Sequence, residues 1–435
     1  MGLWGVGAAT VMLVLTIGVL IPTSCMHLSE KVLRHGSPLH PDISLVFEGN
    51  LKQWSEILPI LKSFDVRAIF FSNPPSGEDE KKMVSQILED GHQCYMPVNS
   101  SATGRVYHAV PAQGPEYQKI YYPKSSWLSL YQFWKWFRMR YPVVLWSLTW
   151  NVSRRNGRKE MRFVRNGSIV RVKGRPADVQ QFAAVLQWLK QSGFRFCTLA
   201  QLARRFRQEK ETLRSSRSAV NRFVFYAWKR WESFLHSLLN MEYVCTPEYE
   251  RTLFRVRKRS YYGRPLPLSD GEWLRRGEPI VELHLNNDMF AQVIQQTRSS
   301  VHLATTLIRL FRRSLPELSR HLADHPKYEH VKAVYGITLM YRGADPFGFS
   351  VSPVPKRWWT RLLTFYLRLY LSVMHPDGRK RLMIRRDKLV PKRVFMPASK
   401  LFSWYPPNGV ENGEPVPSHG HNMEVEVRKG GATRG

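Results

Sequence analysis

The sequence predicts an α/β protein with an N-terminal membrane anchor, a distorted (β/α) barrel as the first domain and a second α+β domain. Three observations carry this prediction. Short apolar runs alternate with segments of helical spacing over residues 42–202, a mixed strand and helix pattern fills residues 221–407, and residues 1–21 contain no charged side chain. A chain of 435 residues is long enough for two or three domains, each with its own core.

The first 21 residues are rich in Leu, Val, Ile, Trp and Met, and about 20 apolar residues span a bilayer. An uncleaved single-pass anchor is therefore expected. No basic residue precedes the run and no Ala-x-Ala motif follows it, which disfavours a cleaved signal peptide. Lys31 and Arg34 follow the run, so the positive-inside rule alone would keep the rest of the chain in the cytoplasm.

The first domain, residues 42–202, alternates predicted strands and helices. Unbroken apolar runs predict strands at residues 43–47, 66–71, 143–150, 168–173 and 194–199. Apolar residues at helical spacing predict helices near 51–61, 84–88 and 179–189. Pro59 is expected to kink the first of these or to delay its start. Gly91 and Gly193 follow the other two, as is typical of helix ends. The alternation indicates a largely parallel sheet or barrel.

The remaining segments differ in composition. Residues 203–220 are charged and poor in apolar residues, so a basic helical linker is expected there. Residues 221–407 form the second domain, which opens with aromatic residues that share one helical face. Residues 408–435 are rich in Gly, Pro and charge without periodicity, so a disordered tail is expected.

The net charge of +31, from 65 basic and 34 acidic residues, predicts an anionic partner. The sequence shows no paired-cysteine zinc spacing, RNA-binding aromatic motif or clear helix-turn-helix. Nucleic acid is therefore not expected, and anionic lipid or an acidic wall polymer is the better candidate. The four cysteines are too few and too scattered for a disulfide framework.

Three stretches of the first domain carry a resemblance to a known family. They are "LVFEGN" with the following helix and strand, "VSQILEDGHQCYMPVNSS", and the closing strand, helix and strand from "SIVRVKGRPADVQQF" to "FRFCTLAQL". Residues 42–202 resemble the NodB-type polysaccharide deacetylases, which remove acetyl groups from amino sugars with a bound metal ion on a distorted (β/α) barrel. The resemblance implies that fold and placement of the bulk of the chain outside the cytoplasm.

The residues that such a deacetylase needs are replaced in this sequence. The resemblance puts Glu48 and Gly49 where the family has its base and its metal-binding aspartate. The other positions hold the metal-binding histidines, an arginine, an aspartate and the general-acid histidine, and they are Pro97, Ser101, Tyr121, Thr149 and Lys173. No catalytic residue, metal ion or other cofactor is therefore expected. Glu48 then reads as a solvated carboxylate at a strand end.

Residues 221–405 resemble a domain of unknown function called YkoP-like, found in spore-forming bacilli and often fused behind a NodB-type domain. The resemblance is carried by "YYGRPLPLSDGEWLRRGEPIVELHLNND", the helices after it and "YGITL". The family offers no activity to transfer. A group of polar residues is the candidate ligand site, namely His284, Asn286, Asp288, Arg275 and Arg276. The alternative is a core histidine before an Asx-rich helix cap.

Two further patterns leave alternatives open. His321, His325 and His330 could hold zinc on a helix, but Pro326 disrupts that helix and favours an exposed polar loop. The aromatic and basic segments 221–240 and 357–374 fit either a helix on anionic lipid or core helices with snorkelling arginines. Aromatic residues near strand ends could stack on sugars or fill the core, namely Tyr121, Trp127, Trp146 and Trp150.

Three classes of function follow. The first is a membrane-anchored, catalytically degenerate deacetylase-like protein of carbohydrate or cell-envelope metabolism, which binds glycan or a partner. The second is an active carbohydrate deacetylase, which the changed motif residues disfavour. The third is a basic structural protein that docks on anionic membrane or wall polymer.

Overall fold

The computed structural model describes residues 32–100, 104–110, 118–124, 138, 140–154, 157–216, 218–296, 300–339, 341, 343–355 and 390–407. The predicted anchor at 1–21, Ser101, Trp127, the segment 357–374 and the tail at 408–435 lie outside these ranges. Within them, no helix combines the length and apolar character that a membrane span requires.

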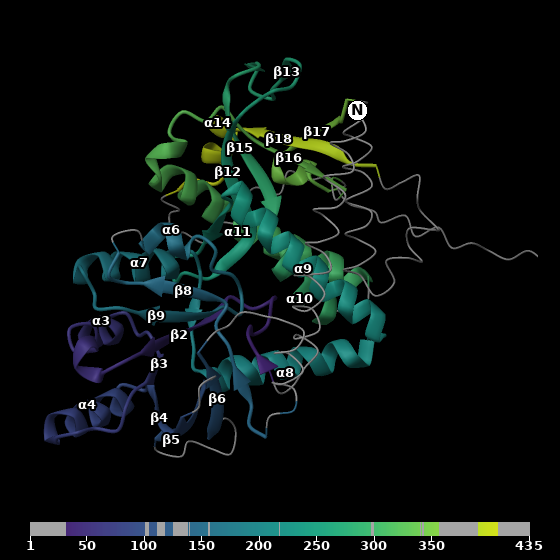
Figure 1. Cartoon of the computed structure of the whole chain (residues 1–435). Coiled ribbons are helices and arrows are strands. Elements are labelled where there is room, and N and C mark those ends of the chain that lie inside the picture. Colours follow the sequence, from purple (N-terminus) through teal and green to yellow (C-terminus); the bar gives the residue numbers. More distant parts are fainter. Residues whose placement is uncertain are drawn as a thin grey trace, which may run out of the picture.

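The first part of the described chain is built on a ten-stranded, mostly parallel sheet (Figure 1). Its strands are β1 (Val32–Leu33), β2 (Asp42–Glu48), β3 (Ala68–Phe71), β4 (Gln93–Ser100), β5 (Gly104–Val110), β6 (Lys119–Pro123), β7 (Val143–Val144), β8 (Leu148–Asn151), β9 (Ile169–Lys173) and β10 (Arg195–Phe196). Their order is β1-β7-β6-β5-β4-β3-β2-β9-β8, and β10 pairs with the start of β2. The α/β prediction is thus confirmed.

Short helices connect these strands. They are the 3-10 helix η2 (Leu51–Trp54), α3 (Leu58–Ser63), α4 (Glu78–Glu89), α6 (Gly157–Met161) and α7 (Val179–Gln191). Pro59 lies in the first turn of α3, where its missing N–H costs no helical hydrogen bond, so it delays the helix rather than kinking it. Gly91 and Gly193 have φ values of +77° and +71°, as expected for residues after helix ends.

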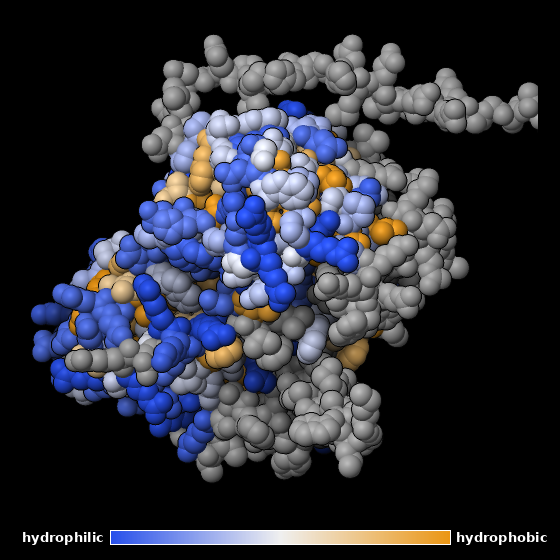
Figure 2. Space-filling view, turned by 90° about the horizontal axis from the view of Figure 1, so that it is seen from above, coloured by the Kyte–Doolittle hydropathy of each residue, from blue (hydrophilic) through white to orange (hydrophobic). Residues whose placement is uncertain are grey.

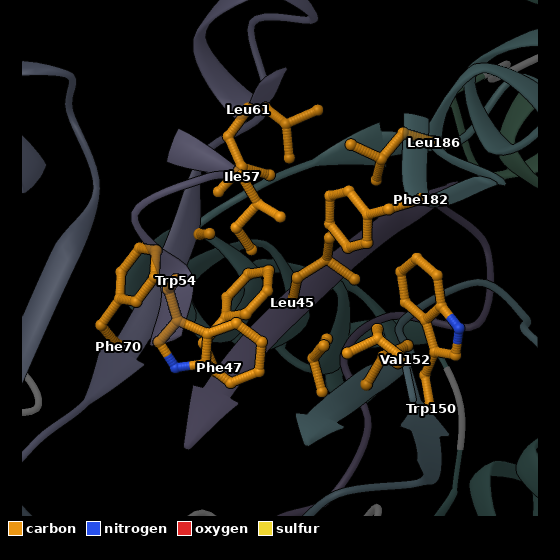
Figure 3. Close-up of a cluster of buried hydrophobic side chains, with 14 of the residues drawn as sticks. Leu45, Phe47, Trp54, Ile57, Leu61, Phe70, Trp150, Val152, Phe182 and Leu186 are labelled. Atoms are coloured by element: carbon orange, nitrogen blue, oxygen red, sulfur yellow. The ribbon is translucent and has the colours of Figure 1, made fainter. Parts of the chain in front are cut away.

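The larger core of this part lies between β2, β3, β8 and β9 and the helices α3, α4 and α7 (Figure 3). Phe47 on β2 stacks on Phe70 with ring centroids 4.9 Å apart. Trp150 on β8 stacks on Phe182 of α7 at 4.9 Å and is 2% exposed. Trp150 is therefore a core residue, which leaves its ring without a free face for a sugar.

One sequence prediction was wrong in this sheet. Residues 143–150 form two strands, β7 and β8, which pair with different neighbours: β7 with β1 and β6, and β8 with β9. A continuous apolar run did not reveal the break because Leu145 and Trp146 between the strands are also buried. The strand β5 runs antiparallel to both β4 and β6, but the other described pairs are parallel, in agreement with the predicted largely parallel sheet.

Residues 203–220 are helical but are more than an exposed linker. Helix α8 (Leu199–Ser216) covers most of them and α9 (Ala219–Leu239) begins at their end. Phe206 and Leu213 of α8 are 4% and 0% exposed and pack in a core cluster that also contains side chains of the first sheet and of α9. Arg205 forms an ion pair with Asp42 of β2. The segment joins the two parts as a packed helix.

The second part has a six-stranded sheet and a two-stranded one. The six strands, in the order β11-β12-β15-β16-β18-β17, are β11 (Glu242–Cys245), β12 (Arg251–Ser260), β15 (Pro279–Leu285), β16 (Ala333–Thr338), β18 (Lys392–Pro397) and β17 (Ser350–Pro353). The smaller sheet pairs β13 (Leu266–Pro267) with β14 (Trp273–Leu274). Antiparallel pairs dominate the larger sheet, and only β15 and β16 pair in parallel.

Helices α9, α10 (Asn287–Gln296) and α11 (Ser300–Asp324) lie beside the region where the two parts meet (Figure 1). The short helix α14 (Ala398–Trp404) follows β18, and the 3-10 helices η3 (Pro326–Tyr328) and η4 (Asp345–Phe347) lie in connections. Leu315, Leu318 and Leu322 of α11 pack into the core of the second sheet. Hydrophilic residues cover most of the described part of the face in Figure 2, with hydrophobic residues in separate groups.

A buried carboxyl group on α8 is expected to make stability depend on pH. Burial raises the pKa of Glu209 to about 7, and a hydrogen bond with Ser37 offsets part of this effect. Because the folded pKa lies above the unfolded value near 4.5, stability should fall as pH rises from about 4.5 to about 7 and level off above. Glu209→Gln should remove this dependence and gain up to about 3 kcal/mol at pH 8.

The measurement is urea denaturation of the full-length protein between pH 5 and pH 8. Glu211→Gln is the matched control, since Glu211 is exposed on the same helix. Parallel pH profiles for the wild type and Glu209→Gln would contradict the assignment.

Candidate functional site

The residues at the carboxyl end of β2 form an ion pair. Glu48, the last residue of β2, pairs with Arg171 of the neighbouring strand β9. The guanidinium carbon of Arg171 also lies 4.3 Å from the centroid of the Trp146 ring. The Glu48 carboxylate is therefore engaged by a cation, whereas the sequence analysis read it as solvated.

Aromatic rings pack around this pair. The ring of Phe71 contacts two tyrosine rings. Its centroid lies 4.6 Å from that of Tyr107 and 4.5 Å from that of Tyr122. Burial, and then the charge of Glu48, raises the pKa of Tyr122 far above its usual range. Aromatic side chains and one ion pair thus lie together at this edge of the sheet.

The residues present do not fit the metal ion of a NodB-type deacetylase. Gly49 has no side chain and a φ of +131°, and Pro97 within β4 has only carbon atoms in its side chain. Tyr121 on β6 is 4% exposed and Lys173 ends β9. Thr149 lies on β8. Zinc sites are built from imidazole, thiolate and carboxylate groups, and the described residues contain no group of three such side chains placed to hold an ion.

Asp288 lies at the start of α10 within a buried network. Its carboxylate accepts hydrogen bonds from Lys229 of α9, from Arg255 of β12 at 2.6 Å and from Asn166 at 3.1 Å. Lys229 also donates to Glu232 at 2.6 Å. Burial opposes the charge on Lys229, but the two carboxylates outweigh it and raise its pKa. The carboxylate of Asp288 thus uses both oxygen atoms in contacts that connect the two parts of the chain.

The predicted candidate site is only partly assembled. Asn286 is buried, donates to the Thr252 carbonyl at 3.1 Å and lies 3.4 Å from Arg255, so it belongs to the same network as Asp288. Arg275 and Arg276 follow β14 and precede β15, whereas Asp288 follows the other end of β15. Arg275 and Arg276 were predicted to join Asp288 in one ligand site. The structure does not bring them together, because the length of β15 separates them from Asp288.

His284 and the histidine cluster also have structural neighbours. His284 lies on β15 with Nε2 3.5 Å from Glu282 Oε1. The rings of His321 and His325 are 4.3 Å apart, and His321 faces Glu242 across 3.9 Å. Burial opposes ionisation of Glu242, but His321 and Lys327 lower its pKa to about 2. His325 and His330 are exposed after the helix, as expected, whereas His321 lies within α11, which continues to Asp324, and its side chain is 12% exposed.

A cavity of about 560 Å³ lies between the two parts of the chain. The first part contributes Arg165 and Trp188 to its lining, and the second contributes Arg230, Tyr243 and His325. The volume falls in the range of pockets for small molecules. Because residues far apart in the sequence meet in it, the cavity is a candidate binding site.

Arg34, Arg165 and Arg230 form a cluster that was not predicted from the sequence, where Arg34 entered only as a charge after the N-terminal run. Burial, and then the charge of Arg165, lowers the pKa of Arg34. Burial, and then the charges of Arg165 and Arg34, lowers the pKa of Arg230 to about 9. Three guanidinium groups therefore lie close enough to repel one another. No local pattern could have revealed this, because each lies in a different segment; the overall positive charge was the only signal.

Comparison with known proteins identifies the domain to which the second part of the chain is similar. The YkoP domain matches residues 221–405. The uncharacterized protein YkoP of Bacillus subtilis (strain 168) is 30% identical over 147 residues, which cover 32% of this chain and 80% of that protein.

Solved structures resemble about two fifths of the chain. A family 4 carbohydrate esterase from Bacillus anthracis is 18% identical and covers 42% of this chain and 92% of its own, with a TM-score of 0.32. BA3943, a CE4 family pseudoenzyme from Bacillus anthracis, is 15% identical and covers 40% and 70%, with a TM-score of 0.29. Identity and TM-score are low in both cases, so the assignment to a family rests on the YkoP match alone. On that match, the chain belongs to the YkoP family.

Proposed function

We propose that this chain is a catalytically degenerate, polysaccharide deacetylase-like protein of the cell envelope, which binds glycan or a partner and does not remove acetyl groups. The observation that carries the proposal is the ion pair of Glu48 with Arg171 at the end of β2. The guanidinium occupies a carboxylate oxygen of Glu48 that a catalytic base would have to present to water.

The neighbouring positions support the same proposal. Gly49 and Pro97 offer no ligand atom to a metal ion, and the aromatic rings of Phe71, Tyr122 and Trp146 fill the space around the pair. In metal-dependent hydrolysis the ion generates the nucleophile by lowering the pKa of bound water. Without its ligands, the chain would lack the source of that nucleophile.

In this proposal residues 1–21 anchor the chain in a membrane and the rest lies outside the cytoplasm, where envelope glycans are found. The uncharged N-terminal run and the resemblance of residues 42–202 support this placement. The net charge of +31 favours an anionic wall polymer as the partner, because 34 acidic residues cannot neutralise 65 basic ones.

The test is an acetate-release assay on N-acetylglucosamine oligosaccharides with purified full-length protein and added zinc. Acetate release is expected to equal that of buffer with zinc alone. Zinc-dependent release that is lost in Glu48→Ala but kept in Glu56→Ala would overturn the proposal. Glu56 is the matched control because its carboxylate is 56% exposed and only weakly paired, 3.8 Å from Arg175.

A further inference from the structure

Two arginines that line the cavity between the two parts, Arg165 and Arg230, form no ion pair with a carboxylate of the described residues. Arg165 comes from the first part of the chain and Arg230 from α9. No carboxylate in the described part of the chain forms an ion pair with Arg34, Arg165 or Arg230. The Nε atom of Arg34 is buried and has no hydrogen-bond partner among the described residues.

The contact that Arg230 does make leaves its charge uncompensated. Its Nη1 lies 2.7 Å from His35 Nε2. A guanidinium group only donates hydrogen bonds, so the histidine nitrogen must accept and the His35 ring must be neutral in this contact. Arg230 therefore has a polar neighbour but no anion.

The carboxylates that line the same cavity are already engaged. Asp288 is held by Lys229 and Arg255, and Glu232 by Lys229. Glu242 pairs with Lys327. Three clustered guanidinium groups without a counter-ion are unfavourable in a partly buried site, because burial strengthens their repulsion. An anion that enters the cavity would balance the positive charge of these three guanidinium groups.

We propose that this cavity binds a small phosphorylated ligand, whose phosphoryl group is held by Arg165 and Arg230 with Arg34 adding positive charge beside them. Guanidinium groups bind phosphate oxygens in a bidentate manner, and a phosphoryl dianion offsets two of the three charges where a carboxylate offsets one. This site is separate from the proposed loss of catalysis, since either claim can hold without the other.

The residues that line the rest of the cavity indicate that the ligand is larger than phosphate itself. The cavity also exposes Trp188, Phe194 and Ser192 of the first part. A volume of about 560 Å³ leaves room for an organic group against these side chains. Phosphorylated glycerol or sugar units have the required size and polarity.

The experiment is calorimetric titration of the full-length protein with glycerol 3-phosphate at constant ionic strength, with glycerol as the neutral control. Wild-type protein should bind glycerol 3-phosphate and not glycerol. Arg165→Gln and Arg230→Gln should each raise Kd by at least about tenfold, the usual effect of losing a hydrogen bond to a charged group. Arg175→Gln, which removes a side chain that is 78% exposed, should leave Kd unchanged.

A second readout separates binding from folding. Without ligand, neither cavity variant should melt below the wild type, because each removes one of three repelling charges. Failure of the wild type to bind, or an equal loss of affinity in Arg175→Gln, would overturn the proposal.

Vesicles containing phosphatidylglycerol test whether a lipid headgroup supplies the phosphoryl group. Release of bound protein from them by free glycerol 3-phosphate would support the site. Vesicle binding that persists in both cavity variants, with no binding of glycerol 3-phosphate, would place membrane contact elsewhere and overturn the proposal.

Discussion

Asp288→Asn is expected to lower the free energy of unfolding by about 3 kcal/mol or more, because it removes one member of a buried ion network. The carboxylate of Asp288 accepts hydrogen bonds from Lys229, Arg255 and Asn166, which come from α9, β12 and the segment before β9. The side chains of Lys229 and Arg255 are 4% and 2% exposed. The substitution keeps the shape of the side chain and leaves two buried cations with fewer partners.

Urea denaturation followed by tryptophan fluorescence measures this loss, and Glu56→Gln is the matched control. Glu56 is exposed and lies 3.8 Å from Arg175, so its removal should cost no more than about 1 kcal/mol. Equal transition midpoints for Asp288→Asn and Glu56→Gln would show that the network does not hold the two parts together.

Trp150→Ala is expected to lower the free energy of unfolding by about 3–5 kcal/mol, the usual cost of removing a large aromatic side chain from a core. Trp150 is 2% exposed and stacks on Phe182 with an interplanar angle of 3°. A Cβ at Gly157 would lie 3.2 Å from Trp150 Nε1, and glycine has no side chain that could fill the cavity left by the substitution. Figure 3 shows Trp150 within the labelled cluster.

Trp273→Ala provides the control, since Trp273 is 50% exposed on the small sheet of the second part. It should change stability by a much smaller amount. If Trp150→Ala instead kept the wild-type midpoint and lost glycan binding, Trp150 would be a sugar platform rather than a core residue.

Local patterns in the sequence were sufficient for most elements of the first part. The apolar run at β2 predicts a strand, and the glycines after α4 and α7 predict helix ends. Both signals depend on residues that are neighbours in the sequence, so they can be interpreted without knowledge of the fold. The packing of α8 could also have been predicted. Leu202, Phe206 and Leu213 recur at helical spacing within its charged sequence, and all three are buried.

The candidate site could not be predicted in the same way. The lack of metal-binding side chains at Gly49 and Pro97 was visible in the sequence, because it depends on residue type alone. The pairing of Glu48 with Arg171 depends on the register between β2 and β9, in which Val46 lies opposite Arg171. The arginine cluster depends on the packing of α9 against the first part, which no local pattern encodes.

The proposed function requires that the first part binds no catalytic metal ion, and metal content tests this requirement most directly. Purified full-length protein is equilibrated with zinc, freed of unbound ions and analysed by elemental mass spectrometry. The account predicts no stoichiometric zinc, cobalt or nickel. One metal ion per chain that disappears in Glu48→Ala but remains in Glu56→Ala would contradict it.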